Sequence, residues 1–418
     1  MKIAQLLFVA LAPFALAKAP LVNRDIADPI ADNYIVVMKN ADSKILHAHY
    51  QQMHASSQST DDGKKGVLRT YQVDGFNGYH IECDNATLET IRKNPIVDYV
   101  ARDGRVTAQT VLRHDIPRSG PGANTWGLGR ISHRDPGISV YADQVAAPTH
   151  AYILDTGIRL THQEFGGRAT FGQNFIAGSK DIDDNGHGTH TAATVGGNTV
   201  GVDNSTRLIA VKVLDQNSSG SWSGIIAGIE WGESFAGDPL YNTTLTLAAV
   251  DDAQSQDRIT RSVINMSIGG PKFQALDDCV KNAVAAGMTI VVAASNYGVD
   301  ACTYSPASAP DAITVAASNE SDARPDWSNY GTCVDIFAPG NNIYSAWKDS
   351  DSSYQTMSGT SMASPHVAGL VTYLMSREFI SGPKNITNRL VELGTPNKVQ
   401  NAKGSPNLIA FNGNKAEL

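Results

Sequence analysis

The segment AYILDTG, residues 151–157, is a short apolar run that ends in an aspartate, and similar runs recur along the 418-residue chain. They are IAVKV at 209–213, SVINM at 262–266, TIVVA at 289–293 and ITV at 313–315. Segments of helical composition separate them. Short apolar runs that alternate with helices are typical of strands buried on both faces of a parallel sheet. We therefore predict an α/β fold with a doubly wound, mostly parallel sheet from Trp126 onward.

Three chemically capable side chains fall at strand ends or helix starts, where such sheets gather their active sites. Asp155 closes the first strand, His187 lies between glycines in NGHGTH at 185–190, and Ser361 lies in GTSMASPH at 359–366. A serine hydroxyl becomes nucleophilic when an imidazole accepts its proton, and a carboxylate orients that imidazole and stabilises its cation. The chain order Asp–His–Ser therefore predicts a catalytic triad of Asp155, His187 and Ser361.

These three segments resemble the signature blocks of the subtilisin-like serine peptidases, and most closely the proteinase K branch with its secreted and vacuolar fungal members. The similarity covers residues 126–413, and residues 34–106 resemble the inhibitory prosegment of that family. The resemblance implies an endopeptidase that cleaves proteins and peptides through an acyl-enzyme, without a catalytic cofactor.

Two other readings of the same residues are less well supported. An α/β-hydrolase has the order Ser–Asp–His and a Gly-x-Ser-x-Gly elbow, which Ser361 lacks. A catalytically inactive binding protein on the same scaffold would have no reason to keep all the catalytic residues.

The resemblance assigns further residues around the triad. Asn296 corresponds to the oxyanion-hole side chain, which would act together with the Ser361 backbone N–H. Ser295 stands where the family usually has glycine. Substrate would bind as an extra strand between two segments at the edges of the cleft. The expected backbone contacts are Ser219, Gly220, Ser267, Ile268 and Gly269.

Specificity follows from the same comparison. Trp222 would line the distal subsites, and the alternative is a tryptophan packed at the surface. The inferred S1 walls, residues 267–270 and 293–296, contain no acidic side chain that could pair with a basic P1 residue. We expect a broad specificity with a preference for an apolar or aromatic P1 residue.

One structural metal site is implied by the resemblance. Pro310, Ala312 and Asp335 match a calcium site of the proteinase K branch, with two backbone carbonyls and one carboxylate as ligands. Calcium accepts such oxygen ligands, although an aspartate at the end of a strand can also serve only as a loop cap. The HGTH sequence at 187–190 lacks the spacing of a zinc protease motif.

The N-terminal residues predict export and processing. Lys2, an apolar run at 3–16 and small residues at 15 and 17 form a signal peptide cleaved after Ala17. The run is shorter than the roughly 20 apolar residues of a membrane span. We expect a secreted protein without a membrane association, with a vacuolar destination as the alternative.

Residues 18–110 are expected to form the inhibitory prosegment, and residues 111–418 a monomeric catalytic domain. Strands at 34–38, 79–81 and 96–100 and helices at 44–53 and 85–92 suggest a ferredoxin-like α+β module. A loose linker at 106–124 would contain the site of autocatalytic cleavage.

Charge and cysteines add three constraints. A net charge of −8 argues against nucleic-acid binding, which needs a basic face. Cys83 lies in the prosegment, so at least one of the other three cysteines lies outside a disulfide. The segments around Cys302 and Cys333 resemble a disulfide-bearing pair in some proteinase K relatives. That resemblance implies a Cys302–Cys333 bond and leaves Cys279 as a buried thiol.

Glycosylation sequons lie at Asn204, Asn217 and Asn385. Residues 232–248 interrupt a helical pattern that begins at Ser223 and resumes at Ala249. Joining the two sides would restore a continuous helix and the spacing of the proteinase K branch. A surface insertion and a translated unspliced intron both remain open, and under the second the sequon at Asn242 is an artefact.

Overall fold

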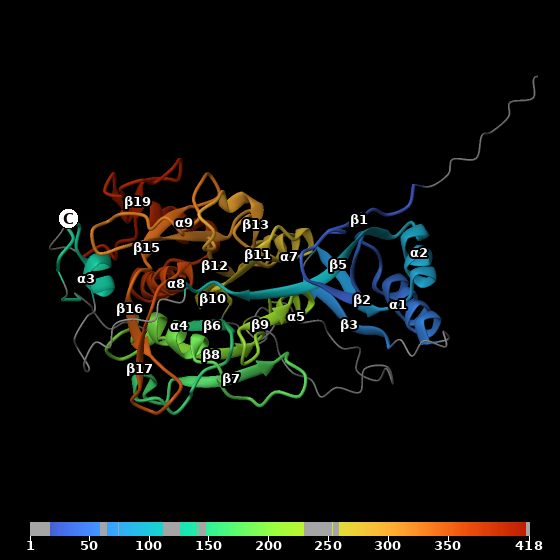
Figure 1. Ribbon diagram of the computed structural model, residues 1–418, viewed down its shortest axis with the longest axis horizontal. Coiled ribbons are helices and arrows are strands. Elements are labelled where there is room, and N and C mark those ends of the chain that lie inside the picture. The colour runs from blue at the N-terminus through green and yellow to red at the C-terminus, as the bar shows by residue number, and fades with distance from the viewer. Residues whose placement is uncertain are drawn as a thin grey trace, which may run out of the picture.

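The computed structural model describes residues 17–58, 65–73, 75–111, 126–138, 140–141, 148–229, 253 and 259–414. Two α/β parts lie side by side and share one long strand, β5 (Val97–Ala108) (Figure 1). Three expectations concern residues outside these ranges: nearly all of the signal peptide, most of the linker, and the insertion at 232–248.

The N-terminal part is the predicted ferredoxin-like module. Its order along the chain is β2 (Pro29–Met38), α1 (Ser43–Gln58), β3 (Gly66–Val73), β4 (Phe76–Glu82), α2 (Asn85–Lys93) and β5. The strands form an antiparallel sheet in the order β5-β2-β4-β3, and the short β1 (Leu21–Val22) pairs with β5. Residues such as Leu46, Met53, Leu88 and Ile91 bury the helices against one face of this sheet.

The second part contains the predicted sheet, in the order β18-β19-β15-β14-β12-β10-β6-β8-β7. The pairs from β7 to β19 are parallel, and only β18 is antiparallel to its neighbour. The prediction of a doubly wound, mostly parallel sheet is therefore confirmed. The strands are β6 (His150–Asp155), β7 (Ala169–Asn174), β8 (Arg207–Lys212), β10 (Ser262–Met266), β12 (Thr289–Ala293), β14 (Ile313–Ser318), β15 (Ile336–Pro339), β18 (Thr395–Pro396) and β19 (Leu408–Ile409).

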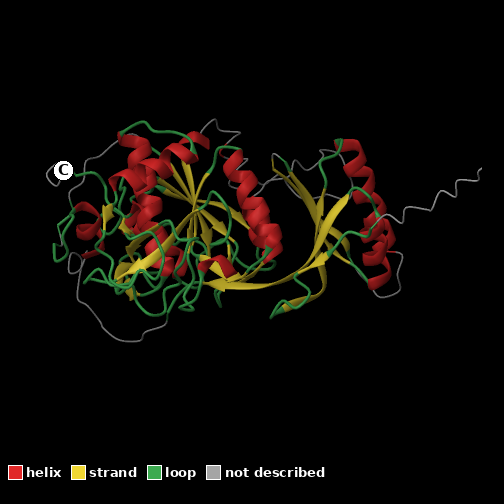
Figure 2. Ribbon diagram, turned by 90° about the horizontal axis from the view of Figure 1, so that it is seen from above, coloured by secondary structure: helices red, strands yellow, loops and turns green. Residues whose placement is uncertain are grey.

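Helices cover both faces of this sheet (Figure 2). Side chains alternate across a strand, so Tyr152 and Leu154 of β6 enter one core while Ala151 and Ile153 enter the other. The first core contains α5 (Trp222–Ile229) and α7 (Gln274–Ala285), and the second contains α3 (Trp126–Ser132), α4 (His187–Gly196), α8 (Thr360–Arg377) and α9 (Pro383–Leu393). Burial on both sides explains why these strands read as continuous apolar runs.

The helix-free face of the prosegment sheet packs on α5 and α7. Ile35, Tyr71 and Phe76 belong to the same buried cluster as Ile225 and Leu276. The Tyr71 hydroxyl donates to the Ser223 carbonyl at 3.0 Å. Both helices of the prosegment lie on the far side of its sheet (Figure 2). The N-terminal part therefore uses one face of its sheet for its own core and the other to pack on the second part.

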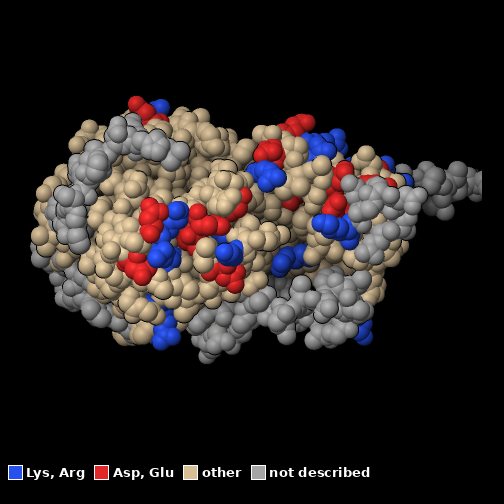
Figure 3. Space-filling view, turned by 60° about the horizontal axis from the view of Figure 1, so that its bottom comes forward, with Lys and Arg blue, Asp and Glu red and all other residues tan. Residues whose placement is uncertain are grey.

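The cysteine prediction is confirmed. Cys302 and Cys333 form a disulfide, and Cys279 is a buried thiol outside it, as is Cys83. Within the described residues, no helix is both long and apolar enough to cross a bilayer. On the face shown in Figure 3, acidic and basic side chains are interspersed and most of the surface is uncharged.

Candidate active site

Asp155 is the last residue of β6 and is fully buried. Its carboxylate accepts hydrogen bonds from the Thr156 N–H at 2.7 Å and from the Thr191 hydroxyl at 3.3 Å. His187 Nδ1 lies 2.7 Å from Oδ1 and 2.9 Å from Oδ2. The carboxylate is thus fixed by its own strand end and by α4, and it holds the imidazole from one side.

His187 is the first residue of α4, and its N-cap, Gly186, is a position that favours glycine. Gly186 has a φ of 112°, and a Cβ there would stand 2.6 Å from the Trp347 ring. The His187 Nε2 atom is buried and has no hydrogen-bond partner among the described residues. With Nδ1 held by Asp155, Nε2 is the ring nitrogen left to accept a proton.

His190 belongs to the same sequence block but has another environment. It bonds to the Ile343 carbonyl at 3.0 Å, and complete burial lowers its pKa to about 3. A histidine that stays neutral and hydrogen-bonded to backbone is a structural group.

Ser361 is the second residue of α8 and is fully buried. Its hydroxyl donates to the Ser267 carbonyl at 2.8 Å and so does not donate to His187. Its backbone N–H donates to the carbonyl oxygen of Gln109 at 3.2 Å. The start of α8 therefore points an N–H, and the positive end of the helix dipole, at a carbonyl group of the prosegment.

Asn296 lies on the other side of the same carbonyl. Its Oδ1 accepts from the Thr360 N–H at 2.9 Å and from the Thr360 hydroxyl at 2.8 Å, which fixes the orientation of the amide. The Nδ2 atom is buried and has no partner among the described residues. A Cβ on Gly359 would stand 3.2 Å from this Nδ2 and 2.5 Å from the Gln109 oxygen. Both atoms therefore border one small space above Gly359.

The strand β5 runs between β9 (Ser219–Ser221) and β11 (Ile268–Pro271) and pairs with both (Figure 1). Thr107 pairs with Ser219 on one side and with Gly269 on the other. In the same stretch, Val106 pairs with Gly220 and Ala108 with Ile268. Three backbone N–H groups also donate to carbonyls: Ala108 to Ser218 (3.0 Å), Gln109 to Ser267 (3.1 Å) and Val111 to Ser358 (2.8 Å). Every residue assigned to substrate binding thus contacts this stretch of the prosegment or lies beside it.

Residues 106–111 were expected to be loose, and the structure corrects that expectation. Residues 106–108 belong to β5, and 109–111 run on through the cleft. The β-branched residues Val106 and Thr107 were a local signal for the longer strand. Their pairing with β9 and β11 is not visible in the sequence, because both partners lie more than 100 residues away.

Trp222 begins α5 and is not packed at the surface. The side chain is fully buried, and its ring stacks on Phe273 with centroids 5.0 Å apart. A Cβ on Gly270 would stand 2.8 Å from the Trp222 ring and 3.6 Å from a Val106 methyl group. The tryptophan therefore lines the cleft beside Val106, three residues before Gln109.

The Gln109 side chain fills the space between the two predicted S1 walls and is 3% exposed. Its Nε2 donates to the Gly269 carbonyl at 2.7 Å and to the Thr107 carbonyl at 3.3 Å. Gln109 was not singled out in the sequence, because a lone glutamine carries no pattern.

The residues of the predicted calcium site lie around the start of β14. One oxygen of the Asp335 carboxylate accepts from the Thr314 N–H at 2.8 Å. Burial raises the pKa of Asp335 to about 6, and the bond from Thr314 opposes that effect. Among the residues with described structure, no group of three or more His, Cys, Asp or Glu side chains could hold a metal. A site built from two carbonyls and one carboxylate would not form such a group, and the desolvated carboxylate fits a cation ligand.

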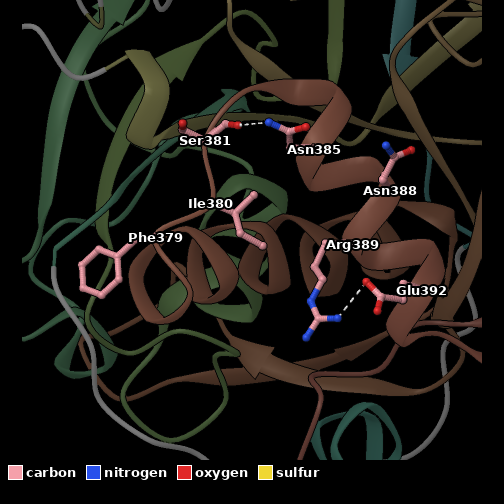
Figure 4. Close-up of a pocket in the computed structure, with 7 residues that line it drawn as sticks. All are labelled: Phe379, Ile380, Ser381, Asn385, Asn388, Arg389 and Glu392. Atoms are coloured by element: carbon pink, nitrogen blue, oxygen red, sulfur yellow. Dashed lines mark hydrogen bonds and ion pairs between the residues drawn. The ribbon is translucent and has the colours of Figure 1, made fainter.

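A cavity of about 430 Å³ lies away from the cleft, beside α9 (Figure 4). It is lined by Phe379, Ile380, Ser381, Asn385, Asn388, Arg389 and Glu392. The Arg389 guanidinium is already paired with Glu378 at 2.7 Å and with Glu392 at 2.8 Å. The predicted site residues do not line this cavity.

Comparison with known proteins agrees with this geometry. A family model described as the subtilase family matches residues 152–403, and one described as peptidase inhibitor I9 matches residues 33–109. Subtilisin-like protease 2 of Pseudogymnoascus destructans is 41% identical over 98% of this chain and 96% of its own length. Alkaline protease 1 of Emericella nidulans is 40% identical over 98% of this chain and 97% of its own.

A solved structure is also similar. The crystal structure of a cold adapted subtilisin-like serine proteinase has a TM-score of 0.59 and 37% identity, and the match covers 69% of this chain and 97% of that one. The chain therefore belongs to the subtilase family and is a serine endopeptidase with an I9-type inhibitor prosegment.

Proposed function

We propose that Asp155, His187 and Ser361 hydrolyse peptide bonds through an acyl-enzyme, with Asn296 in the oxyanion hole. Ser361 Oγ attacks the scissile carbonyl carbon while its proton passes to His187 Nε2, and Asp155 stabilises the imidazolium. The carbonyl oxygen becomes an oxyanion that accepts from the Ser361 N–H and Asn296 Nδ2. His187 then protonates the leaving amine, and water releases the acyl group by the same route.

The observation that carries this proposal is the position of the Gln109 carbonyl. It accepts from the Ser361 N–H and lies beside Asn296 Nδ2, which has no hydrogen-bond partner among the described residues. A carbonyl held there is oriented for attack by the hydroxyl of the same serine.

The same position supports autocatalytic maturation at the Gln109–Thr110 bond. The proposed divisions are a signal peptide at 1–17, a prosegment at 18–109 and a catalytic domain at 110–418. The expected boundary after residue 110 thus moves by one residue, to the Gln109–Thr110 bond. The I9 family match also ends at Gln109. The prosegment would remain bound after cleavage as an inhibitor, because β5 and the packed sheet face hold it.

The proposed enzyme is secreted, with a vacuolar destination as the alternative, and works as a monomer on proteins and peptides. The proposed enzyme accepts many substrates and prefers an uncharged side chain at P1. The S1 walls at 267–270 and 293–296 lack a carboxylate, which supports the predicted preference for apolar or aromatic P1 residues. A polar but uncharged side chain, Gln109, occupies the pocket in the precursor.

The test is maturation of the full chain and of its Ser361→Ala variant. We expect the wild-type protein in the culture medium to begin at Thr110 by N-terminal sequencing, and to lose casein hydrolysis to a serine-directed phosphonate. Ser361→Ala should remain an uncut precursor. A variant that matures and digests casein at the wild-type rate would refute the triad, and a first cut at another bond would refute the assignment of Gln109.

Calcium at Pro310, Ala312 and Asp335 is proposed as a structural ligand. Because bound metal stabilises only the folded state, the Tm of mature enzyme should be higher in calcium than in EDTA. Asp335→Asn should remove this difference, whereas Asp349→Asn, a change at an exposed carboxylate, should keep it. Equal Tm values for the wild type in calcium and EDTA would rule the site out.

A further inference from the structure

Ser295 lines the pocket that holds the Gln109 side chain. Its hydroxyl is buried and has no hydrogen-bond partner among the described residues. A Cβ on Gly269 would clash with Ser295 Oγ, and it would stand 3.2 Å from Gln109 Cγ and 3.3 Å from Gln109 Cδ. The Ser295 hydroxyl, the Gly269 backbone and the Gln109 side chain therefore surround one small volume.

The backbone of Ser295 is held in an unfavourable conformation. Its φ is 79°, in the left-handed region that favours glycine. The N–H donates to the Thr360 hydroxyl at 3.1 Å, and the carbonyl accepts from the Asn329 N–H at 2.9 Å. These bonds fix the residue between the oxyanion side of the site and a neighbouring loop, so its side chain stays directed at the pocket.

Two local costs therefore coincide at one residue. A non-glycine residue at positive φ is strained, and a buried hydroxyl without a partner loses its hydration without compensation. Glycine at this position would carry neither cost. Residues that violate local rules in this way concentrate at functional sites.

We infer that Ser295 sets the P1 preference, so that the enzyme selects a P1 side chain with a hydrogen-bonding group over an apolar side chain of equal length. This inference rests on the proposed function, since it describes the S1 pocket of that protease. It revises the proposed preference for apolar or aromatic P1 residues: apolar residues are still accepted, but glutamine is preferred to methionine.

The chemistry of the pocket supports this order. The Gln109 amide nitrogen donates to the Gly269 carbonyl of the pocket wall and to the Thr107 carbonyl of its own strand. An amide also has an acceptor oxygen. In the precursor the Ser295 hydroxyl makes no hydrogen bond to the Gln109 amide, and rotation about the Ser295 Cα–Cβ bond moves this donor between staggered positions in the same pocket. Methionine has a similar length but offers only a weak acceptor. Phenylalanine needs the volume that the Ser295 Cβ and Oγ occupy.

The test uses mature enzyme, titrated with a serine-directed phosphonate, and substrates Val-Thr-Ala-X-p-nitroanilide that copy residues 106–108. X is Gln, Met or Phe, and kcat/KM is measured for wild type, Ser295→Ala and Ser295→Gly. Ser295→Ala removes only the hydroxyl, whereas Ser295→Gly also removes the Cβ and the strain. One hydrogen bond changes such ratios by roughly tenfold.

We expect the wild type to favour Gln over Met about tenfold, and both variants to bring that ratio to about one. Ser295→Gly should also raise the Phe:Met ratio about tenfold above that of Ser295→Ala. A wild-type enzyme without a preference for Gln, or a Gln:Met ratio unchanged in Ser295→Ala, would overturn the inference while leaving the protease assignment intact. Absence of turnover with all three substrates would overturn both.

Discussion

The Ser267 carbonyl accepts two hydrogen bonds at the proposed cleavage site, from the Gln109 N–H and from the Ser361 hydroxyl. The second of these keeps the nucleophile's proton away from His187 Nε2, which is left without a partner in the described structure. Rotation about the Cα–Cβ bond of Ser361 moves the hydroxyl between staggered positions. Under the proposed mechanism, such a rotation must release the hydroxyl from the Ser267 carbonyl before its proton can pass to His187.

Asn296 supports a prediction at the same scale. Its Oδ1 is occupied by Thr360, so its remaining capacity is the unpartnered Nδ2 beside the Gln109 carbonyl. A donor that acts only on the oxyanion stabilises the transition state and not the bound substrate. We expect Asn296→Ala to lower kcat by about 10²–10³, the range known for such a donor in subtilisin, with little change in KM.

The control for this prediction is Asn388→Ala, because Asn388 is exposed and lines the remote cavity of Figure 4. Its kcat should match that of the wild type. If kcat falls less than threefold in Asn296→Ala, the side chain has no part in the oxyanion hole.

At the scale of elements, the sequence predicted the buried strands better than the cleft. Apolar runs such as 289–293 identify β12 because burial on both faces leaves a continuous pattern. Strand β3 has no such pattern, and residues 105–108 of β5 pair with segments far along the chain. Trp222 was ambiguous for a related reason: stacking on Phe273 depends on tertiary contacts that local sequence does not encode.

The sequence predicted the triad and Asn296 through motifs of fixed local spacing. It could not place Gln109, whose position follows from the register of β5 between β9 and β11. The structure also adds Asp103, a residue of β5 in the prosegment whose carboxylate lies at the N-terminus of α5. The Ser223 N–H and hydroxyl donate to its carboxylate at 3.2 and 2.6 Å. A carboxylate at a helix N-terminus is stabilising, and here it comes from the inhibitor.

This cap and its neighbour His80 predict how inhibition depends on pH. Burial raises the pKa of Asp103 from 3.8 to about 6, so Asp103 strengthens binding as the pH falls through 6. Burial, with a smaller contribution from Arg69, lowers the pKa of His80 from 6.5 to about 4, so His80 weakens binding as the pH falls from 6.5. The two effects have opposite signs because the two pKa values shift in opposite directions. The groups are also neighbours, with His80 Nε2 3.6 Å from Asp103 Oδ2.

Single substitutions should separate the two effects. The measurement is the Ki of added prosegment for mature enzyme between pH 6.5 and 4, as a ratio to the wild-type Ki, which cancels titration of the triad. The ratio should rise toward the low end of this range for Asp103→Asn and fall for His80→Gln, each by up to roughly a hundredfold. Ratios that stay constant with pH would show that neither group titrates on release.

At the scale of the whole molecule, the prosegment contacts the catalytic domain in two ways, through the open face of its sheet and through strand β5. The open face of the prosegment sheet, with Ile35, Tyr71 and Phe76, contributes to the core around α5 and α7, while β5 continues into the cleft. Each contact supports the other, because the sheet that packs on the helices also fixes the register of the strand. Displacing the inhibitor therefore exposes apolar surface and opens the cleft in one event.

The continuity of β5 through the cleft has a kinetic consequence. While the Gln109–Thr110 bond is intact, inhibitor and enzyme are one molecule, and dilution cannot separate them, because the local concentration of a tethered group is independent of the bulk solution. Cutting that bond turns the pair into a bimolecular complex whose dissociation depends on how dilute it is. If the proposed maturation holds, each enzyme freed in this way digests the inhibitor of another, and activity should appear after a delay and then accelerate. Once the strand is cut, the rate of activation therefore depends on the protein concentration.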